Sequence, residues 1–536
     1  MERPVGGYAL LGVAACAALV LPAFFLPPVP IDETRYLAVA WTMHAGGHWL
    51  VPWLDGAPYP DKPPLLFWLI NLAWWVTGVH AWSARLLEVL LALATLPPLR
   101  RLAFALSADA RAAAKATWLW LGCIAFAGFA GAVMFDLLLT LCVLSAWLGG
   151  VWLARGQMRL GTVWLALGLG LGILTKGPVS LLVGGLPALL APWWHPAVRG
   201  RPGRHYLALL LALAGAAVLA LAWALPAARA GGPAYGDAIF LKQTAGRVAE
   251  SFAHDRGPAW YLPIVPLLML PWTLGLGRGV PASDPAAAPG HRLLDRFALA
   301  ATLPAFLVFC LISGKQPHYL LPLLPALALP AGARLAAGRW RVVGWRVGLV
   351  LLVIAVGFAV ALARLAPQAP VMAYACLGGA ALPGVALVAR GRRPTTVATA
   401  AVATLVLVAL AKAAFVLGLG PRYAVQAAAA RIASAQRAGI PLLHAGQQQG
   451  LYTFAGRLTA PIATARSQAQ VAAWATAHPG GWVISSYRHY DYAATPLYQQ
   501  PFLGRRLAIW RAADIAAQAA ANARTRAPEE PADAGD

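Results

Sequence analysis

The sequence predicts an all-α, polytopic membrane protein with a small α/β domain near its C-terminal end. Of the 536 residues, 60% are hydrophobic and only 11% are charged, which is less than half the charged share of soluble domains. Apolar runs of about 17–25 residues recur along most of the chain, and this length crosses about 30 Å of hydrocarbon. The runs are continuous rather than alternating, which excludes a β-barrel. Soluble enzymes, disordered chains and fibrous proteins are excluded as well.

The apolar runs predict about thirteen membrane spans. We place them at residues 8–27, 83–99, 116–134, 137–153, 161–175, 178–194, 206–228, 259–276, 297–313, 318–333, 347–365, 371–389 and 396–419. Every second connecting loop is rich in arginine, as the loop after residue 99 and the loop after residue 389 show. Because basic loops stay in the cytoplasm, this alternation predicts a cytoplasmic N-terminus. The net charge of +23 therefore reflects topology, and no nucleic-acid partner is expected.

One further apolar run, residues 64–79, bears on this topology. Counting it as a span would move all the later basic loops to the outside. The run is short and holds Trp68, Trp74 and Trp75, which favour the membrane–water interface. We therefore expect an interfacial helix within a long outer loop, residues 28–82.

The last part of the chain differs in composition from the membrane domain, which we place at residues 1–420. Residues 421–515 mix polar residues with short apolar runs such as 482–484, preceded by a helical stretch at 467–478. These features predict a small α/β domain on the outer side, which also holds the loop 229–258. Residues 516–536 are rich in Ala, Pro and acids, and we expect them to be disordered.

Basic residues stand at the outer ends of several spans. An ionisable group at a membrane boundary costs free energy unless it is solvated or paired. Three of the six lysines, Lys62, Lys176 and Lys315, lie there beside Gly or Pro. Snorkelling to the interface explains any one of them. Together with Arg35, Arg247 and Arg256 they predict a pocket for an anion, and phosphate is the natural ligand of such donors.

Acidic residues occur on the same side. Asp32 and Glu33 start an amphipathic helix, and a role at the helix N-terminus accounts for Glu33 and in part for Asp32. The apolar face of this helix comprises Tyr36, Val39, Ala40 and Met43. Asp136 lies between two apolar runs with almost no loop, so it is the stronger candidate for a functional acid.

A divalent cation is an alternative that the residues leave open. Glu250 and His254 are four positions apart, so they would share one face if this stretch is helical, and they could then hold a cation with Asp61 or His318. Pairs of this kind also occur by chance. No H-E-x-x-H, G-x-S-x-G, Walker or G-x-G-x-x-G motif occurs in its required context, which excludes the hydrolases and nucleotide-driven machines that use them.

Six motifs then recur in a recognisable order. They are IDETRY, YPDKPPLLFWL, an Asp after the third span, LTKGP, HDRGPAWYLP and GKQPHYLLP. In this order they resemble the GT-C membrane glycosyltransferases of the protein-mannosyltransferase superfamily, and in particular the branch with the aminoarabinose lipid A transferase. The resemblance covers roughly residues 20–335. Beyond it, the remaining spans and the tail agree in layout only.

The resemblance implies a sugar donor carried on a polyprenyl phosphate and an inverting transfer on the periplasmic side. It implies that Asp32 orients or deprotonates the acceptor and that Asp136 is a second acid in the site. The residues expected to bind substrate or phosphate are Glu33, Arg35, Tyr59, Lys62, Lys176, Arg247, Lys315, His318 and Tyr319. No cofactor follows from the sequence, and a divalent metal ion stays open. Relatives place a metal ion near the positions of Asp61 and His254, but the usual Glu is the shorter Asp61 here.

We therefore expect a multi-pass protein of the bacterial inner membrane with a periplasmic C-terminal domain. The expected reaction moves 4-amino-4-deoxy-L-arabinose from its lipid carrier to lipid A. Transfer of another sugar, or transfer to a protein or another envelope glycan, is the alternative within the same class. A transporter of lipid-linked anions is the alternative outside it. Transporters usually show two related halves with polar groups near the midplane, whereas the polar groups here gather at one face.

Overall fold

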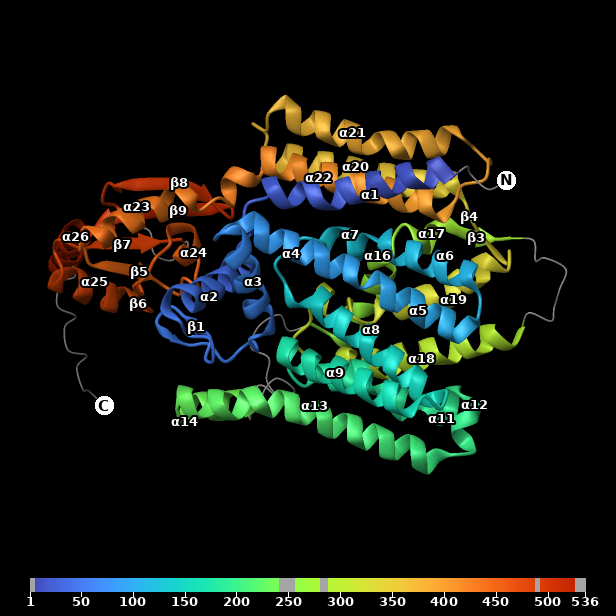
Figure 1. The fold of residues 1–536 in the computed structure, drawn as a ribbon. Coiled ribbons are helices and arrows are strands. Elements are labelled where there is room, and N and C mark those ends of the chain that lie inside the picture. The colour runs from blue at the N-terminus through green and yellow to red at the C-terminus, as the bar shows by residue number, and fades with distance from the viewer. Residues whose placement is uncertain (1–4, 241–255, 280–287, 487–491, 526–536) are drawn as a thin grey trace, which may run out of the picture. The chain divides into compact units, whose positions relative to one another are not determined.

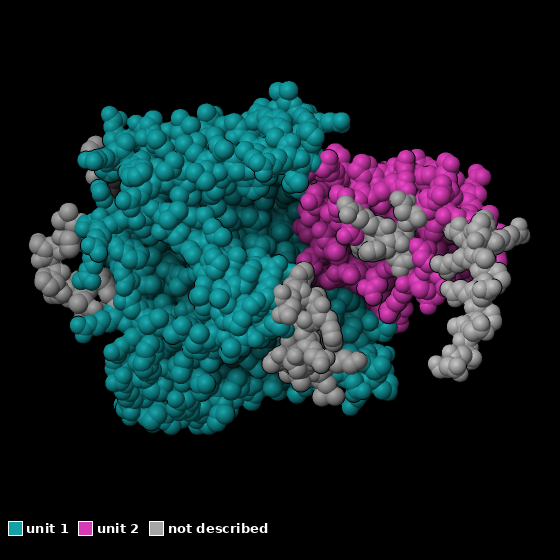
Figure 2. Space-filling view, turned by 180° about the vertical axis from the view of Figure 1, so that it is seen from behind, with its two compact units in different colours: residues 1–26, 49–52, 58–418 teal, residues 27–48, 53–57, 419–536 magenta. Residues whose placement is uncertain are grey.

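The computed structural model describes residues 5–240, 256–279, 288–486 and 492–525 (Figure 1). The chain forms two compact units, coloured separately in Figure 2. Residues 1–26, 49–52 and 58–418 make up one, which we call the membrane unit. Residues 27–48, 53–57 and 419–536 make up the other, which we call the sheet unit.

The membrane unit is almost entirely helical. Its longer helices are α1 (Val5–Phe25), α3 (Leu65–Thr77), α4 (Ala81–Ala94), α5 (Leu96–Ser107), α6 (Ala110–Leu121), α8 (Phe135–Ala154), α9 (Met158–Lys176), α13 (Pro202–Gly231), α18 (Ala288–Leu311), α19 (Leu324–Ala336), α20 (Gly344–Leu365), α21 (Val371–Ala389) and α22 (Val397–Gly418). Short helical segments join them: α7 (Ile124–Phe129), η1 (Leu181–Gly185), α10 (Leu186–Leu189), α11 (Ala191–Trp194), α12 (Pro196–Arg199), α14 (Pro233–Asp237), η3 (Pro258–Trp260), α16 (Tyr261–Leu268), α17 (Trp272–Gly275) and η5 (Pro317–Leu320). Two short antiparallel strands, β3 (Leu276–Arg278) and β4 (Trp340–Val342), complete the unit.

Eight helices in the described part of the chain are long and apolar enough to cross a membrane. They are the continuous pair α4–α5, then α8, α9, α13, α18, α20, α21 and α22, and each coincides with a predicted span. The other five predicted spans fall on helices whose apolar stretch is shorter, such as Ala9–Phe25 in α1, or on interrupted helices. The span expected at 178–194, for example, is divided among η1, α10 and α11, because Pro187 and Pro192 cannot continue a regular helix. The count of thirteen stays a prediction.

The apolar run at 64–79 forms α3. Its 13 residues rise only about 20 Å, which is less than the thickness of the hydrocarbon layer. The indole of Trp68 donates a 2.8 Å hydrogen bond to the carbonyl of Trp49, so the helix is tied to the residues of the first loop that belong to this unit.

Helix α8 lies at the centre of the membrane unit. In its apolar window 83% of the residues are buried. Trp147 packs edge-on against Phe297 of α18 at 6.0 Å and donates a 2.9 Å hydrogen bond to the carbonyl of Val183. The indole N–H is thereby satisfied inside an apolar core, as a buried polar group requires.

Helices α8 and α9 form an antiparallel pair whose backbones touch. A Cβ atom on Gly149 would lie 2.5 Å from the amide nitrogen of Leu165, and a Cβ on Gly168 would lie 2.5 Å from that of Ala146. Small residues allow such close approach between membrane helices. The pair therefore brings the first turn of α8 and the last turn of α9 to the same end.

Helix α13 is the longest helix described, with 30 residues. Near its C-terminal end the indole of Trp223 donates a 2.9 Å hydrogen bond to the carbonyl of Leu50. This bond anchors residues 49–52 of the first loop to the helix.

The sheet unit is built around a five-stranded mixed sheet. Its elements are α2 (Asp32–Gly46), β1 (Trp53–Leu54), β2 (Ala57–Pro58, at the unit boundary), η6 (Gly420–Arg422), α23 (Gln426–Arg437), β5 (Leu442–Ala445), α24 (Thr453–Gly456), β6 (Ala463–Ala465), α25 (Gln468–Ala477), β7 (Trp482–Ser485), β8 (Tyr498–Phe502), β9 (Arg505–Arg511) and α26 (Ala512–Thr525). The strand order is β6-β5-β7-β9-β8. Strand β5 pairs in parallel with β6 and β7, whereas β9 pairs antiparallel with β7 and β8.

Both faces of this sheet are covered by helices. Val483 and Trp510, paired across β7 and β9, pack with residues of α25 and α26. Their neighbours Ile484 and Ile509 point to the opposite face and pack with α23. The predicted helix at 467–478 is confirmed as α25, and the short apolar run at 482–484 lies in strand β7.

The expected disordered tail differs in its first part. Residues 516–525 belong to α26, and residues 526–536 lie outside the described residues. The expectation of disorder was wrong for residues 516–525 because this stretch is rich in alanine, which has the highest helix propensity.

Candidate functional site

The expected site residues fall in both units, and we describe each group within its own unit. In the sheet unit they lie at the start of α2. Glu33 is buried, and its Oε2 accepts a 2.6 Å hydrogen bond from the backbone N–H of Val29. This bond satisfies a donor ahead of the helix, so Glu33 has the N-terminal role that the sequence predicts.

Asp32 and Arg35 are two partly exposed charged residues of this helix. The Asp32 side chain is 47% exposed, and its Oδ1 lies 3.6 Å from Nη1 of Arg35. The residues of the predicted apolar face, Tyr36, Val39, Ala40 and Met43, are all buried. Burial of that face leaves the Asp32 carboxylate largely open to solvent, whereas the Arg35 side chain is only 21% exposed.

In the membrane unit a carboxylate and a lysine form an ion pair. Asp136 is in the first turn of α8 and Lys176 is the last residue of α9. Lys176 Nζ donates a 2.6 Å hydrogen bond to Asp136 Oδ1. The same ammonium group lies 4.6 Å above the ring of Tyr319, which is the geometry of a cation–π contact.

Segment η5 adds aromatic side chains to this pair. The rings of His318 and Tyr319 meet edge-on at 4.8 Å, and His318 lies 6.0 Å from Phe129 of α7. The structure thus brings together four of the expected residues, Asp136, Lys176, His318 and Tyr319. They combine a negative charge, a positive charge and aromatic faces, which suits a charged and partly apolar ligand.

The other expected residues of this unit have different surroundings. Lys315 is buried, and its Nζ donates to the carbonyls of Ile312 and Arg256, the latter at 2.7 Å. These bonds are those of a lysine that ties two backbone segments together. Tyr59 is buried, Asp61 is exposed, and Lys62 Nζ donates a 3.4 Å hydrogen bond to the backbone carbonyl of Asp61.

The described residues do not assemble a metal centre. Among residues 5–240, 256–279, 288–486 and 492–525, no three His, Cys, Asp or Glu side chains are grouped closely enough to hold a metal ion. Asp61 supplies a single exposed carboxylate. Arg247, Glu250 and His254 lie outside the described residues, so the expected pair of Asp61 and His254 stays a prediction.

Three charged residues inside predicted spans were not among the expected site residues: Arg85 and Glu88 are buried, and Lys412 is partly buried. Arg85 and Glu88 lie in α4, and Lys412 lies in α22. Arg85 Nη1 donates a 2.9 Å hydrogen bond to the carbonyl of Gly131, and Lys412 Nζ donates to two carbonyls at the C-terminal end of α7, at 3.2 and 2.9 Å. The signal was present, because an ionisable residue within a predicted span is a functional candidate by default.

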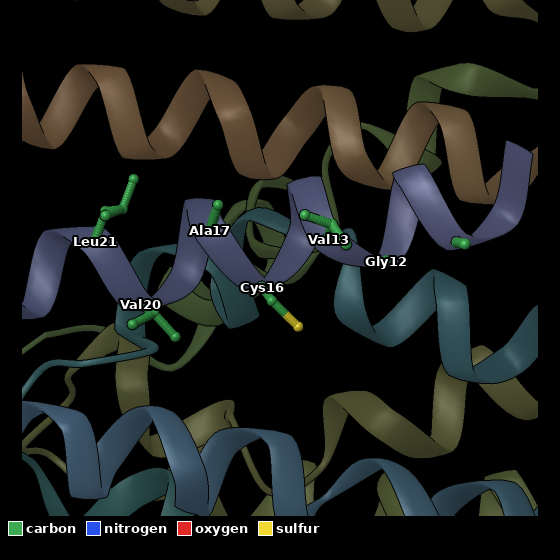
Figure 3. Close-up of a pocket in the computed structure, with 7 residues that line it drawn as sticks. Gly12, Val13, Cys16, Ala17, Val20 and Leu21 are labelled. Atoms are coloured by element: carbon green, nitrogen blue, oxygen red, sulfur yellow. The ribbon is translucent and has the colours of Figure 1, made fainter. Parts of the chain in front are cut away.

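A hollow of about 520 Å³ lies along α1, lined by side chains between residues 9 and 21 (Figure 3). Its walls are alanine, glycine, valine, leucine and Cys16. Such a surface suits acyl chains and offers nothing to a phosphate or a sugar. The hollow is therefore separate from the site chemistry.

Comparisons with known proteins now bear on these observations. No family model matches the chain. Curated proteins named undecaprenyl phosphate-α-4-amino-4-deoxy-L-arabinose arabinosyl transferase do match it. The protein from Sodalis glossinidius is 30% identical over 305 residues, which is 56% of this chain and 53% of that protein. The one from Edwardsiella ictaluri is 31% identical over 329 residues, 58% of this chain and 57% of that protein. The chain thus matches about half the length of these relatives.

The crystal structure of ArnT from Cupriavidus metallidurans matches almost the whole chain. Bound to undecaprenyl phosphate it gives a TM-score of 0.72 at 20% identity, covering 95% of this chain and 98% of that one. The apo structure gives 0.73 at 19% identity, covering 95% and 99%. This chain has the ArnT fold. The predicted polytopic helical fold with a small C-terminal α/β region is thereby confirmed, and the chain is a multi-pass membrane protein that resembles the aminoarabinose transferases.

Proposed function

We propose that the protein is an inverting glycosyltransferase that uses a sugar carried on undecaprenyl phosphate. We further propose that the sugar is 4-amino-4-deoxy-L-arabinose and the acceptor lipid A. The observation that carries the proposal is the pair of Asp136 and Lys176 at the ends of α8 and α9, with Tyr319 against the lysine. The names of the curated relatives support the choice of sugar.

The chemistry needs neutralisation of a phosphate and placement of an acceptor oxygen. The acceptor oxygen forms a bond to the anomeric carbon from the face opposite the carrier. The bond between that carbon and the phosphate oxygen breaks, its electron pair stays on the phosphate, and undecaprenyl phosphate leaves. Asp32 orients the acceptor and takes its proton where the oxygen carries one. Lys62, Lys176 and Arg35 stabilise the charge that grows on the leaving phosphate.

The proposal also includes the cellular location and the membrane topology of the chain. We place the chain in the bacterial inner membrane with its N-terminus in the cytoplasm, because the basic loops then all face inward. Residues 1–420 form the membrane domain, with the loops 28–82 and 229–258 in the periplasm. Residues 421–515 form a periplasmic domain.

The test is mass spectrometry of lipid A and of total envelope glycans from a deletion strain complemented with wild type or with Asp32→Asn. The proposal expects a pentosamine mass increment on a lipid A phosphate with wild type, and at least a 100-fold loss in the variant, because general-base catalysis contributes about 10²–10⁴-fold. Asp514→Asn, an exposed acid in α26, is the control and should behave as wild type. Both variants must be present in the membrane at wild-type levels.

Other outcomes would contradict different parts of the proposal. An unchanged lipid A with an altered glycan or glycoprotein would overturn the acceptor. No change in any sugar-bearing envelope component would overturn the transferase and favour transport of a lipid-linked anion. Full activity of Asp32→Asn would remove Asp32 from the mechanism.

A further inference from the structure

A loop of the C-terminal region contacts the helix that carries Asp32. Residues 446–450 follow strand β5, and the side-chain carbonyl of Gln449 accepts a hydrogen bond from Nη2 of Arg35. The next residue, Gly450, donates its backbone N–H to Oδ2 of Asp55 at 3.1 Å. Both contacts lie inside the sheet unit, and their partners are 414 and 395 residues apart in the chain.

The backbone of this loop is shaped for close contact. Gln449 has a backbone φ of 51° and Gly450 a φ of 72°. Residues other than glycine seldom adopt this left-handed region. A Cβ atom on Gly450 would lie 2.6 Å from Cβ of Ala38 and 2.8 Å from Cδ1 of Leu54. The loop therefore presses directly on α2 and on strand β1.

The partner residue Asp55 is itself held in a tight turn. Asp55 and Gly56 join β1 to β2 with φ of 51° and 83°, which is the two-residue turn that favours Asp-Gly. On the other side of this turn, a Cβ on Gly56 would lie 2.9 Å from Cβ of Pro461. The hairpin thus meets the C-terminal region at both of its turn residues.

A separate contact holds the middle of α2. The indole of Trp41 donates a 2.8 Å hydrogen bond to the carbonyl of Leu458, and the guanidinium of Arg457 lies 5.3 Å above the Trp41 ring. Helix α2 is therefore fixed at its first turn and again two turns later by residues 446–458. A single chance contact would not restrain the helix in this way.

We propose that the loop 446–450 is a positioning element for α2, and that Gln449 is a positioning residue that orients the guanidinium of Arg35. Arg35 is approached by Asp32 at Nη1, at 3.6 Å, and by Gln449 at Nη2. Contacts at both terminal nitrogens fix the plane of the guanidinium, which is what planar recognition of a phosphate requires. The inference rests on the proposed function, in which Arg35 contacts the carrier phosphate, and it gives the C-terminal region a role in that contact.

The experiment measures binding of undecaprenyl phosphate to the purified full-length protein, together with the donor KM and kcat. Gln449→Ala should weaken lipid binding and raise the donor KM by about tenfold, the effect of losing one hydrogen bond to a charged group, while kcat changes much less. Gln449→Glu keeps an acceptor for Arg35 and should restore most of the binding. Gln447→Ala removes an exposed glutamine two positions away and should leave binding unchanged.

A double-mutant cycle separates this inference from the proposed function. If Gln449 acts through Arg35, then Gln449→Ala should have no further effect on binding in an Arg35→Ala background. Wild-type binding by Arg35→Ala would overturn the phosphate role of Arg35. Impaired binding by Arg35→Ala with wild-type binding by Gln449→Ala would overturn the positioning role alone. Equal losses in Gln449→Ala and Gln449→Glu, with all variants folded, would also overturn it.

Discussion

Lys176 and Asp136 are joined at 2.6 Å between Nζ and Oδ1, although 40 residues separate them in the chain. Their side chains are only 13% and 3% exposed. The ammonium group is thus shared between a carboxylate and the ring of Tyr319. In the proposed reaction the carrier phosphate would compete with Asp136 for the Lys176 ammonium group. The strength of the ion pair therefore affects how tightly Lys176 can bind the phosphate.

This burial makes the two charges depend on each other. Lys176→Met alone leaves the Asp136 carboxylate buried and unpaired, which should lower the free energy of unfolding by about 3–5 kcal/mol. The double variant Lys176→Met/Asp136→Leu should lose much less, because no charge is left uncompensated. Thermal and denaturant unfolding in detergent would measure this. Strictly additive losses in the two single variants and the double variant would show that the charges are not coupled.

The contact between α8 and α9 should be as sensitive as the ion pair that it supports. Gly168→Ala places a Cβ 2.5 Å from the backbone nitrogen of Ala146, so the helices must separate, at a cost of about 1–3 kcal/mol. Gly357→Ala in α20 adds a methyl group to open space and should be neutral or slightly stabilising. The two melting temperatures, compared in the same detergent, check the prediction. Equal shifts would contradict it.

Lys412 should matter for stability although it lies within a membrane helix. Lys412→Met removes the donor to two carbonyls at the end of α7, and we expect a loss of about 1.5–3 kcal/mol in unfolding free energy. Lys412→Arg keeps the charge and the donors and should retain most of the stability. Denaturant titration of the purified variants provides the measurement. A Met variant as stable as wild type would show that these bonds contribute nothing net.

The stability of the sheet unit should depend on pH through Asp55. Burial raises the pKa of this carboxyl to about 6 from its ordinary value of 3.8, although the N–H of Gly450 and the charge of Arg35 act in the opposite direction. The folded state therefore binds the proton more tightly than the unfolded state, so stability falls as pH rises from about 4 to about 6. Above pH 6 the buried, ionised Asp55 lowers the free energy of unfolding by up to about 3 kcal/mol.

Asp55→Asn tests this directly, because asparagine suits the same turn and still offers an oxygen to Gly450. The variant should be more stable than wild type near pH 7, and the difference should shrink toward pH 4. Melting curves across this range for both proteins would show it. Parallel pH profiles would rule out Asp55 as the titrating group.

Much of the membrane unit could be predicted from hydropathy, but the pairing of its polar groups could not. The long helices α8 and α9 were evident as apolar runs, and Asp136 and Lys176 were evident as charges at their ends. Their contact depends on which glycines let the two backbones touch, which depends on packing geometry rather than on composition. The span expected at 178–194 is divided by prolines, which end a regular helix locally, and hydropathy does not register that effect.

The sheet unit was harder to anticipate. The helix at 467–478 and the short apolar run at 482–484 were evident in the sequence. Nothing local in the sequence, however, indicates that Arg35 meets Gln449 or that Asp55 meets Gly450. Such contacts between residues about 400 positions apart arise only from the three-dimensional fold.

The length of α13 has a consequence for how the protein responds to its lipid. The helix has 30 residues, and its predicted apolar span, residues 206–228, extends about 35 Å, slightly beyond a hydrocarbon layer of about 30 Å. Trp223 fastens the first loop near one end. A helix that exceeds the bilayer adjusts by tilting. We therefore expect bilayer thickness to change the tilt of α13 and, with it, the position of Trp223 and of residues 49–52. The acyl-chain length of the surrounding phospholipids would then affect this loop.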